Sequence, residues 1–293
     1  MATPPERSDS DSAKRQESAL FTERTPRIVA ARGLLRRRNR DNHGRFLVEG
    51  AQAVREAITY GSVLELFVTE RAASRHPDLL AAPRFRVSLI TERAAAGLSE
   101  TASPQGIVAV CATLGRPAVD TVRGAQLVAV LLGVSDPGNA GTIIRVADAA
   151  GADAVLFAGD TVDPHNGKCV RASTGSVFHL ALGVEPDPFT AVAACRQAGL
   201  QILATDADTG RDLDDLIDAG GLAVPTAWLF GNEAHGLDRE LLASADQAIA
   251  IPLHGRAESL NLAAAAAICL YASARAHRRR SGRRTDHLGS SQN

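Results

Sequence analysis

Three short polar segments of the chain combine residue types that could bind a ligand and orient a reacting group. They are DPGNAGTIIR (136–145), LFGNEAHGL (229–237) and IPLHGRAESLNLAAAAA (251–267). Each places Gly, Asn and a charged side chain directly after an apolar run. Gly lets the backbone approach a ligand closely, and Asn and charged groups supply directed hydrogen bonds. Gly and Asn are also ordinary turn residues, so one such segment alone would not indicate a site.

The familiar signatures of nucleotide-binding and hydrolytic enzymes are missing. Gly133, Gly138 and Gly141 do not form GxGxxG, and Gly167-Lys168 lacks the rest of a P-loop. The sequence has no HExxH and no GxSxG nucleophile turn. Its four cysteines lie far apart without zinc-binding spacing, which predicts buried thiols in a reducing compartment and no bound metal.

Six apolar runs alternate with helical patterns between residues 125 and 277, which predicts an α/β domain with a mainly parallel sheet. The runs are QLVAVLLGV, DAVLFAG, LALGVE, LQILATD, TAWLFGN and QAIAIPL, and a long Ala-rich helix follows them. A ligand crevice in such a sheet forms at the carboxyl ends of the strands. We therefore expect the three polar segments to meet there.

Residues 25–114 mix helical and strand patterns at short intervals and predict a separate α/β module of ordinary domain size. Residues 115–124 carry Gly and Pro without apolar periodicity and are expected to form a linker. We predict a disordered leader over residues 1–24 and a basic tail over 278–293. No apolar run approaches the length of a membrane span and no secretory signal is visible, so we expect a cytoplasmic protein.

The net charge of −1 conceals a strong asymmetry along the chain. Residues 1–124 carry 19 Lys and Arg against 14 Asp and Glu, whereas residues 125–275 carry 8 against 18. Residues 24–55 hold nine arginines and two acids, a pattern typical of proteins that bind a polyanion such as RNA. A solvated helix face would give a similar pattern, so charge alone leaves both interpretations open.

Together the three segments resemble the motifs of the SpoU/TrmH family of RNA ribose 2′-O-methyltransferases, within the SPOUT superfamily. The first carries NxGxxxR, the second GNExxG and the third IPxxGxxxSLN, in the family's order. The stretch RRRNRDNHGRFLVEGAQAVREAI resembles the L30e-like substrate-binding domain that precedes many SpoU domains. The resemblance implies a homodimer with its active site at the subunit interface. It also implies a deep trefoil knot, which sequence rhythm alone would not suggest, because true knots are very rare.

The resemblance assigns the cofactor, S-adenosylmethionine, to loops made by the second and third motifs. We expect backbone groups to hold it, at positions Gly231, Ile251, Leu253, Leu260 and Thr205. Gly231 and Gly255 would let the backbone approach the cofactor closely. Ser259 precedes the last helix and could cap it or help to hold the loop.

The reaction implied by the resemblance is attack of a ribose 2′-hydroxyl on the sulfonium methyl group. Arg145 matches the family's catalytic arginine, but a guanidinium with a pKa above about 12 is a poor base. We therefore expect Arg145 to hold a nucleotide phosphate and stabilise the developing alkoxide, while a phosphate oxygen or water takes the proton. Asn139 is expected near the nucleophile and Glu233 to order the second loop. Ser259 and Asn261 complete the expected catalytic group.

RNA contacts are expected from Arg36, Arg37, Arg38, Arg40, Arg45 and Arg171. The front domain favours 23S ribosomal RNA as the substrate, because free-standing tRNA members of the family generally lack it. Three alternatives remain: a tRNA 2′-O-methyltransferase, an rRNA methyltransferase of the thiostrepton-resistance type, and a non-catalytic RNA-binding or ribosome-assembly factor. The presence of all five expected catalytic residues argues against the non-catalytic alternative.

Overall fold

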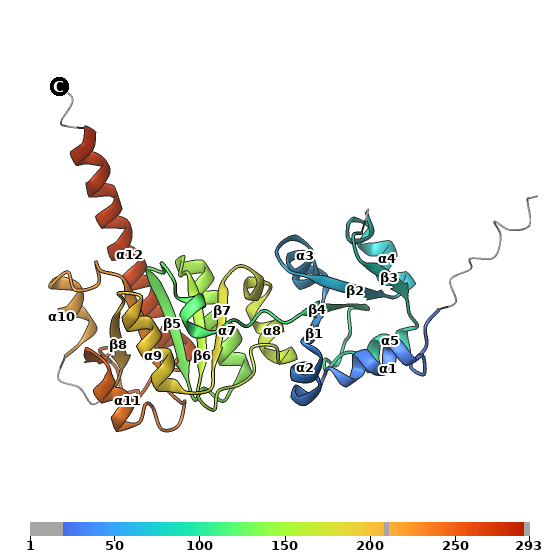
Figure 1. The fold of residues 1–293 in the computed structure, drawn as a ribbon, viewed down its shortest axis with the longest axis horizontal. Helices are drawn as coiled ribbons and strands as arrows, with labels where there is room; N and C mark the ends of the chain where they lie inside the picture. The colour runs from blue at the N-terminus through green and yellow to red at the C-terminus, as the bar shows by residue number, and fades with distance from the viewer. Residues whose placement is uncertain (1–19, 82, 208–210, 290–293) are drawn as a thin grey trace, which may run out of the picture.

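The computed structural model describes residues 20–81, 83–207 and 211–289, in two α/β domains that lie side by side (Figure 1). Each domain has its own sheet, one of four strands and one of six. Most of the expected leader falls outside the described residues. The part that is described is not free, because the Phe21 amide donates to the Leu89 carbonyl oxygen at 2.9 Å. The prediction of a disordered segment up to residue 24 is therefore wrong for its last residues.

The N-terminal domain contains a mixed sheet. Its elements are α1 (Pro26–Gly33), α2 (Arg37–His43), β1 (Arg45–Glu49), α3 (Ala51–Tyr60), β2 (Val63–Val68), α4 (Glu70–Arg75), the 3₁₀ helix η1 (Pro77–Leu80), β3 (Arg86–Leu89), α5 (Glu92–Gly97) and β4 (Ile107–Ala112). The strand order is β1-β4-β2-β3, with β4 antiparallel to both neighbours and β2 parallel to β3. The short edge strand β3 was not predicted, because only one of its four residues is buried and the sequence shows no clear alternation.

The segment between the domains is packed. Residues 118–121 form the short helix α6 (Ala118–Thr121), in which Ala118 is buried, and Val122 beyond it is buried as well. The Arg116 amide donates to the Leu182 carbonyl oxygen at 3.0 Å. The predicted linker over 115–124 is thus attached to the C-terminal domain and does not span freely between the two domains.

The C-terminal domain contains a parallel sheet. Its elements are β5 (Leu127–Leu132), α7 (Pro137–Ala150), β6 (Ala154–Ala158), α8 (Gly167–Ser173), η2 (Ser176–Phe178), β7 (Ala181–Glu185), α9 (Pro188–Gln197), β8 (Gln201–Thr205), α10 (Leu213–Asp218), β9 (Thr226–Phe230), α11 (Arg239–Ser244), β10 (Gln247–Ile249) and α12 (Leu262–Gly289). The order is β10-β8-β9-β5-β6-β7, and every neighbouring pair is parallel. All six predicted strands and the parallel sheet are confirmed.

Helix α12 is longer than the sequence pattern suggested. It continues to Gly289, so the tail predicted from residue 278 begins as part of this helix. The Trp228 indole of β9 donates to Ser273 Oγ of α12 at 2.9 Å, and both residues are fully buried. This bond fixes α12 against the sheet, since a buried polar group left without a partner would be costly. In the part of the chain that the structure describes, no helix is long and apolar enough to cross a membrane.

A buried ionic cluster joins the two domains. Arg40 Nε lies 2.7 Å from Asp163 Oδ2, and the Asp163 carboxylate also accepts from the His165 amide at 2.8 Å. The His165 ring in turn accepts from the Leu114 amide at 3.0 Å. Burial opposes the ionisation of Asp163. Hydrogen bonds from His165 and the charge of Arg40 nevertheless hold the pKa of this carboxyl well below its usual range. We call Arg40, Asp163 and His165 the interdomain cluster.

All four cysteines are free and buried. Burial raises the pKa of the Cys111 and Cys195 thiols to about 12 and raises those of Cys169 and Cys269 as well. Such thiols behave as small apolar core residues. Among the described residues, no group of three or more His, Cys, Asp or Glu side chains could hold a metal ion.

Candidate active site

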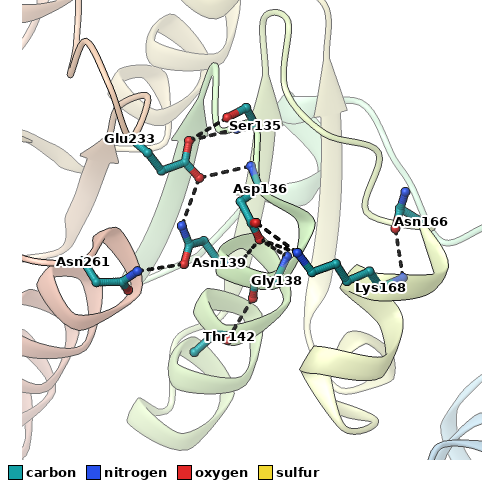
Figure 2. A network of polar contacts seen from close by, with 9 residues as sticks. All are labelled: Ser135, Asp136, Gly138, Asn139, Thr142, Asn166, Lys168, Glu233 and Asn261. Atoms are coloured by element: carbon teal, nitrogen blue, oxygen red, sulfur yellow. Dashed lines mark hydrogen bonds and ion pairs between the residues drawn. The ribbon is translucent and has the colours of Figure 1, made fainter. Parts of the chain in front are cut away.

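The three polar segments meet at the carboxyl edge of the parallel sheet (Figure 2). Asn139 Nδ2 of the first segment donates to Glu233 Oε1 of the second at 3.1 Å. Asn261 Nδ2 of the third donates to Asn139 Oδ1, also at 3.1 Å. We call Asn139, Glu233 and Asn261 the three-loop network. The predicted convergence of the segments is confirmed, whereas the roles of the individual residues remain predictions.

Glu233 fastens the second loop to the first. Its carboxylate accepts from the Ser135 amide at 3.1 Å, from Ser135 Oγ at 3.0 Å and from the Asp136 amide at 3.1 Å. Partial burial opposes ionisation of Glu233, but the hydrogen bonds from Ser135 and Asn139 outweigh it and lower its pKa. A carboxylate with a lowered pKa and this many donors is a weak base. This geometry fits the role expected of Glu233, which is to order the second loop.

The first helix of the site begins with a strong cap. Asp136 accepts from the Asn139 amide at 3.0 Å and from the Gly138 amide, and Pro137 occupies the first helical position. Lys168 Nζ lies 3.0 Å from Asp136 Oδ2. This hydrogen bond and those from the backbone lower the pKa of Asp136. The cap fixes the first turn of α7, which carries Asn139.

Asn261 has a second role at the start of α12. Its Oδ1 accepts from the Ala263 amide at 2.9 Å and from the Ala264 amide at 3.4 Å, as a helix cap does. The side chain of Ser259 makes no hydrogen bond to any described residue. Asn261, and not Ser259, is therefore the cap. The exposed Ser259 hydroxyl remains available to a ligand.

The expected cofactor positions surround the ends of the central strands. Thr205 ends β8 and donates through Oγ1 to the Leu229 carbonyl oxygen at 3.1 Å. Gly231 follows β9, and Ile251, Leu253 and Leu260 lie in the third loop. Leu253 and Leu260 are 38% and 37% exposed, which is unusual for leucine. No backbone group of residues 251–260 hydrogen-bonds to another described residue.

Two motif glycines are required by the protein's own packing. A Cβ at Gly231 would lie 2.4 Å from the Gly236 carbonyl carbon, because the second loop folds back on itself. A Cβ at Gly141 would lie 2.3 Å from the Cys169 carbonyl oxygen, because α7 packs closely on α8. A Cβ at Gly255 would meet nothing within 4 Å, so the space beside Gly255 is open. Of these three, only Gly255 has no internal reason to be glycine.

Arg145 is exposed on α7, six residues after Asn139. The helical rise places it about 9 Å farther along the helix axis than Asn139. Its Nη1 donates to Thr174 Oγ1 at 3.5 Å. Thr174 has φ +53°, and it is the one non-glycine residue with positive φ in the described chain. Threonine rarely adopts this conformation, so the surroundings hold Thr174 in place beside Arg145.

The arginines expected to bind RNA differ in their exposure. Arg36, Arg37, Arg38 and Arg45 are exposed. Arg40 is only 4% exposed and paired with Asp163, so its expected RNA contact is wrong. A one-dimensional run of arginines does not reveal which of them turns inward.

Arg171 lies between the domains. Its Nη1 is 3.5 Å from Glu49 Oε2 and 3.7 Å from Glu100 Oε2, and its side chain is 29% exposed. These carboxylates neutralise the guanidinium, so Arg171 is a poor candidate for the phosphate contact expected of it.

Three residues of the site were not predicted: Ser135, Lys168 and Thr174. Lys168 and Thr174 lie in a segment, KCVRASTG, that follows no strand directly and therefore gave no crevice signal. Ser135 stands immediately before the first segment, and its hydrogen bonds to Glu233 depend on how the second loop folds.

Comparison with known proteins places the two domains in known groups. Residues 126–271 match the SpoU rRNA Methylase family. Residues 25–109 match the MRM3-like substrate binding domain. The chain is 35% identical over 236 residues to the Bacillus subtilis protein named 23S rRNA (guanosine(2553)-2'-O)-methyltransferase RlmP, covering 80% of this chain and 90% of that protein. The chain therefore belongs to the SpoU rRNA methylase family.

Other relatives and solved structures agree. A Streptomyces viridochromogenes protein named 23S rRNA (uridine(2479)-2'-O)-methyltransferase is 34% identical over 267 residues, covering 87% of this chain and 91% of the relative. The structure of the SpoU methyltransferase AviRb from the same organism, in complex with AdoMet (S-adenosylmethionine), superposes with a TM-score of 0.75 at 30% identity. It covers 86% of this chain and 98% of AviRb. An AdoMet-bound rRNA methyltransferase from Sinorhizobium meliloti gives a TM-score of 0.74 at 31% identity, covering 86% of this chain and 95% of that one.

Proposed function

We propose that this protein is an S-adenosylmethionine-dependent RNA methyltransferase that modifies a ribose 2′-hydroxyl of 23S ribosomal RNA. The observation that carries this proposal is the position of Asn139. Its side chain is hydrogen-bonded to both Glu233 and Asn261, and it lies on the same helix, α7, as Arg145. Two relatives that match along most of the chain are named for this reaction on 23S rRNA. Their names support the choice of ribosomal RNA over tRNA.

The residues at the sheet edge fit S-adenosylmethionine. The cofactor's adenine needs apolar surface and backbone hydrogen-bonding groups. The third loop supplies both, because Leu253 and Leu260 are exposed and the backbone of residues 251–260 has no partner among the described residues. Open space beside Gly255 leaves room for a ligand. When bound, the cofactor supplies a methyl group on a positively charged sulfur.

The chain's own side chains would orient the RNA. Arg145 is exposed, so its guanidinium can hold a phosphate and stabilise negative charge as it develops on the ribose oxygen. Asn139 is fixed by two neighbours and can position the 2′-hydroxyl. Positioning of this kind can contribute about 7–11 kcal/mol of the barrier. The proton passes to a phosphate oxygen or to water.

The proposal includes a homodimer. The exposed residues Asn261, Ala264, Ile268 and Tyr271 at the start of α12 recur every three or four positions and so share one face. Ile268 is 41% exposed and Tyr271 is 47% exposed. Because Asn261 begins this face, a second copy packed there would lie beside the site. Tyr271→Glu is expected to give monomers, which sedimentation would detect.

A deep trefoil knot and a cytoplasmic location belong to the same proposal. The knot is supported by the return of α12 to the sheet beside β5 and β9, with Trp228 bonded to Ser273. The location is supported by the proposed substrate, which is ribosomal RNA. Unfolding and refolding of the whole chain, followed by the recovery of S-adenosylmethionine binding, would show the slow threading step that a knot requires.

Methyl transfer tests the proposed function. Purified protein, labelled S-adenosylmethionine and 23S rRNA lacking its modifications should give 2′-O-methylation at one mapped ribose. The Asn139→Ala variant should lose this activity, whereas Arg123→Lys, a change at an exposed arginine outside the three segments, should keep it. Binding of rRNA without any methyl transfer would instead identify a non-catalytic RNA-binding protein. Methylation of tRNA but not of 23S rRNA would identify tRNA as the substrate.

The exposed arginines of the N-terminal domain have their own test. Changing Arg36, Arg38 and Arg45 to Gln should reduce the slope of log affinity against log salt by about 0.7–0.9 for each phosphate that is no longer neutralised. The Arg84→Gln and Arg239→Gln variants remove exposed charges elsewhere and serve as controls. An unchanged slope would place the RNA-binding surface on another face.

A further inference from the structure

A cavity of about 450 Å³, lined by polar and apolar groups, lies between the two domains. The N-terminal domain supplies Gln52, Thr101, Ser103 and Gln105, and the α8 region of the C-terminal domain supplies Arg171 and Thr174. This volume lies within the range of about 300–1,000 Å³ that small-molecule sites occupy. None of the three motif loops lines the cavity, so the cofactor site does not account for it.

The cavity is adjacent to the proposed reaction centre. Thr174 lines it, and the Oγ1 of Thr174 accepts a hydrogen bond from Arg145 Nη1 at 3.5 Å. Thr174 therefore contacts both the cavity and Arg145, and its backbone is in the left-handed conformation. A ligand group in the cavity would therefore lie next to the nucleotide that Arg145 is proposed to hold.

The one positive side chain that lines the cavity is already paired with carboxylates. Arg171 faces Glu49 and Glu100 at 3.5 and 3.7 Å. Glu49 also accepts a hydrogen bond from Thr101 Oγ1 at 2.9 Å. A phosphate would have to displace these carboxylates from Arg171. The cavity is suited to a neutral polar group.

Two amide side chains offer complementary hydrogen-bonding atoms. Gln105 Oε1 accepts from the Ala51 amide at 3.1 Å, which fixes the orientation of the amide and leaves Nε2 as a donor with no partner among the described residues. Gln52 Nε2 donates to Glu56 Oε1 at 2.7 Å, which leaves Gln52 Oε1 as an acceptor. Gly50, Ala53 and Ala102 are too small to fill the space between them. One donor and one acceptor are what the edge of a nucleobase requires.

We propose that this cavity binds the base of an unpaired nucleotide in the RNA, next to the nucleotide that is methylated. Gln105 and Gln52 hydrogen-bond to the edge of the base. Thr174, which lines the cavity and is hydrogen-bonded to Arg145, places the bound base beside Arg145. The domain junction thereby selects an RNA loop with an unpaired base at a fixed distance from the target ribose. This inference rests on the proposed function, because it takes RNA as the ligand.

The test pairs changes in the protein with changes in the RNA. Gln105→Glu keeps an acceptor for the Ala51 amide but replaces the free donor by an oxygen, and Gln52→Ala removes the acceptor. Gln197→Glu makes the same chemical change on exposed α9 and is the control. The probe is a stem-loop transcript from 23S rRNA chosen because the protein binds it, with each loop nucleotide made abasic in turn. Affinity is measured by fluorescence anisotropy, and KM and kcat are measured by methyl transfer.

With the wild-type protein and the Gln197→Glu control, one abasic position should weaken binding by about tenfold, the size of one specific base interaction. The same abasic change should have no effect in the Gln105→Glu, Gln52→Ala double variant, because that protein no longer hydrogen-bonds to the base. The Kd for S-adenosylmethionine should not change. If each abasic position changed the affinity of the double variant as much as that of the wild type, the cavity assignment would be overturned. Thermal unfolding of each variant excludes general loss of structure.

This design separates the two proposals. Binding with the abasic pattern but without methyl transfer would support the cavity assignment and contradict the proposed function. Methyl transfer without the abasic pattern would support the proposed function and contradict the cavity assignment.

Discussion

The interdomain cluster and the three-loop network share the same chemistry but differ in exposure. Each has a carboxylate that joins segments far apart in the chain, Asp163 in the first and Glu233 in the second. The side chains of Arg40 and Asp163 are 5% and 9% exposed, whereas Glu233, Asn139 and Asn261 are bonded at the surface. Both carboxyls have lowered pKa values. The buried interdomain cluster holds the two domains together. The exposed three-loop network holds loops in position where a ligand can reach them.

This difference predicts that damage to the buried network appears as lost stability. Asp163→Asn should lower the free energy of unfolding by about 3–5 kcal/mol, because the charge of Arg40 is then buried without a counterion. Denaturant unfolding measures this loss. Asp160→Asn, at an exposed position nearby in the sequence, should change it by less than about 0.5 kcal/mol. The double variant Arg40→Met, Asp163→Leu should recover most of the loss, and failure to do so would show that the charges themselves stabilise the junction.

Damage at the exposed site should appear as lost activity. Arg145→Lys should lower kcat by about 10²-fold, the effect of losing one well-placed donor to developing negative charge. Lysine keeps the charge but not the forked geometry. The melting temperature should not change, since Arg145 is exposed. Full activity of the Lys variant would mean that charge alone suffices.

The Glu233→Gln variant separates positioning from base catalysis. Ser135, Asp136 and Asn139 all donate to Glu233, and a Gln amide would point a donor at one of them. We expect kcat/KM to fall by about tenfold, from the loss of one such hydrogen bond. The activity should not depend on pH across roughly the neutral range, because a lowered carboxyl pKa lies far below it. A loss of about 10⁴-fold would identify Glu233 as a base. Glu240→Gln is the matched control on exposed α11.

The smallest effect is expected at a second contact between the domains. His179 Nδ1 lies 2.8 Å from Asp148, and its Nε2 lies 3.2 Å from Glu56 of the other domain. Burial opposes protonation, but hydrogen bonds to both carboxylates raise the pKa of His179. Its contribution is therefore fully present below the unfolded pKa of about 6.5 and is lost as pH rises through the higher folded value.

His179→Gln should abolish this pH dependence and cost less than about 1 kcal/mol near pH 6, as partly exposed ion pairs do. Unfolding of the wild type and the variant at about pH 6 and about pH 9 measures the difference. A wild-type protein that gains stability over this interval relative to the variant would contradict the assignment. His43→Gln, at an exposed histidine that ends α2, is the control.

Parallel strands explain why the three-loop network could be predicted from sequence. Six buried runs separated by helices place their carboxyl ends at one edge, so loops 94 and 122 residues apart must meet, as Glu233 and Asn261 do at Asn139. The inward turn of Arg40 could not be predicted in this way. It depends on Asp163, which is 123 residues away in a loop without a strand pattern. The conformation of Thr174 and the capping by Asn261 depend equally on tertiary packing.

The four concealed thiols make the molecule convenient for spectroscopy. With Cys111, Cys169, Cys195 and Cys269 all inaccessible and protonated, a maleimide dye should leave the native protein unlabelled. A cysteine introduced at Gln197 and another at Arg84 would then take a donor and an acceptor fluorophore with no background. Energy transfer between them would report whether the two halves move when a transcript is added.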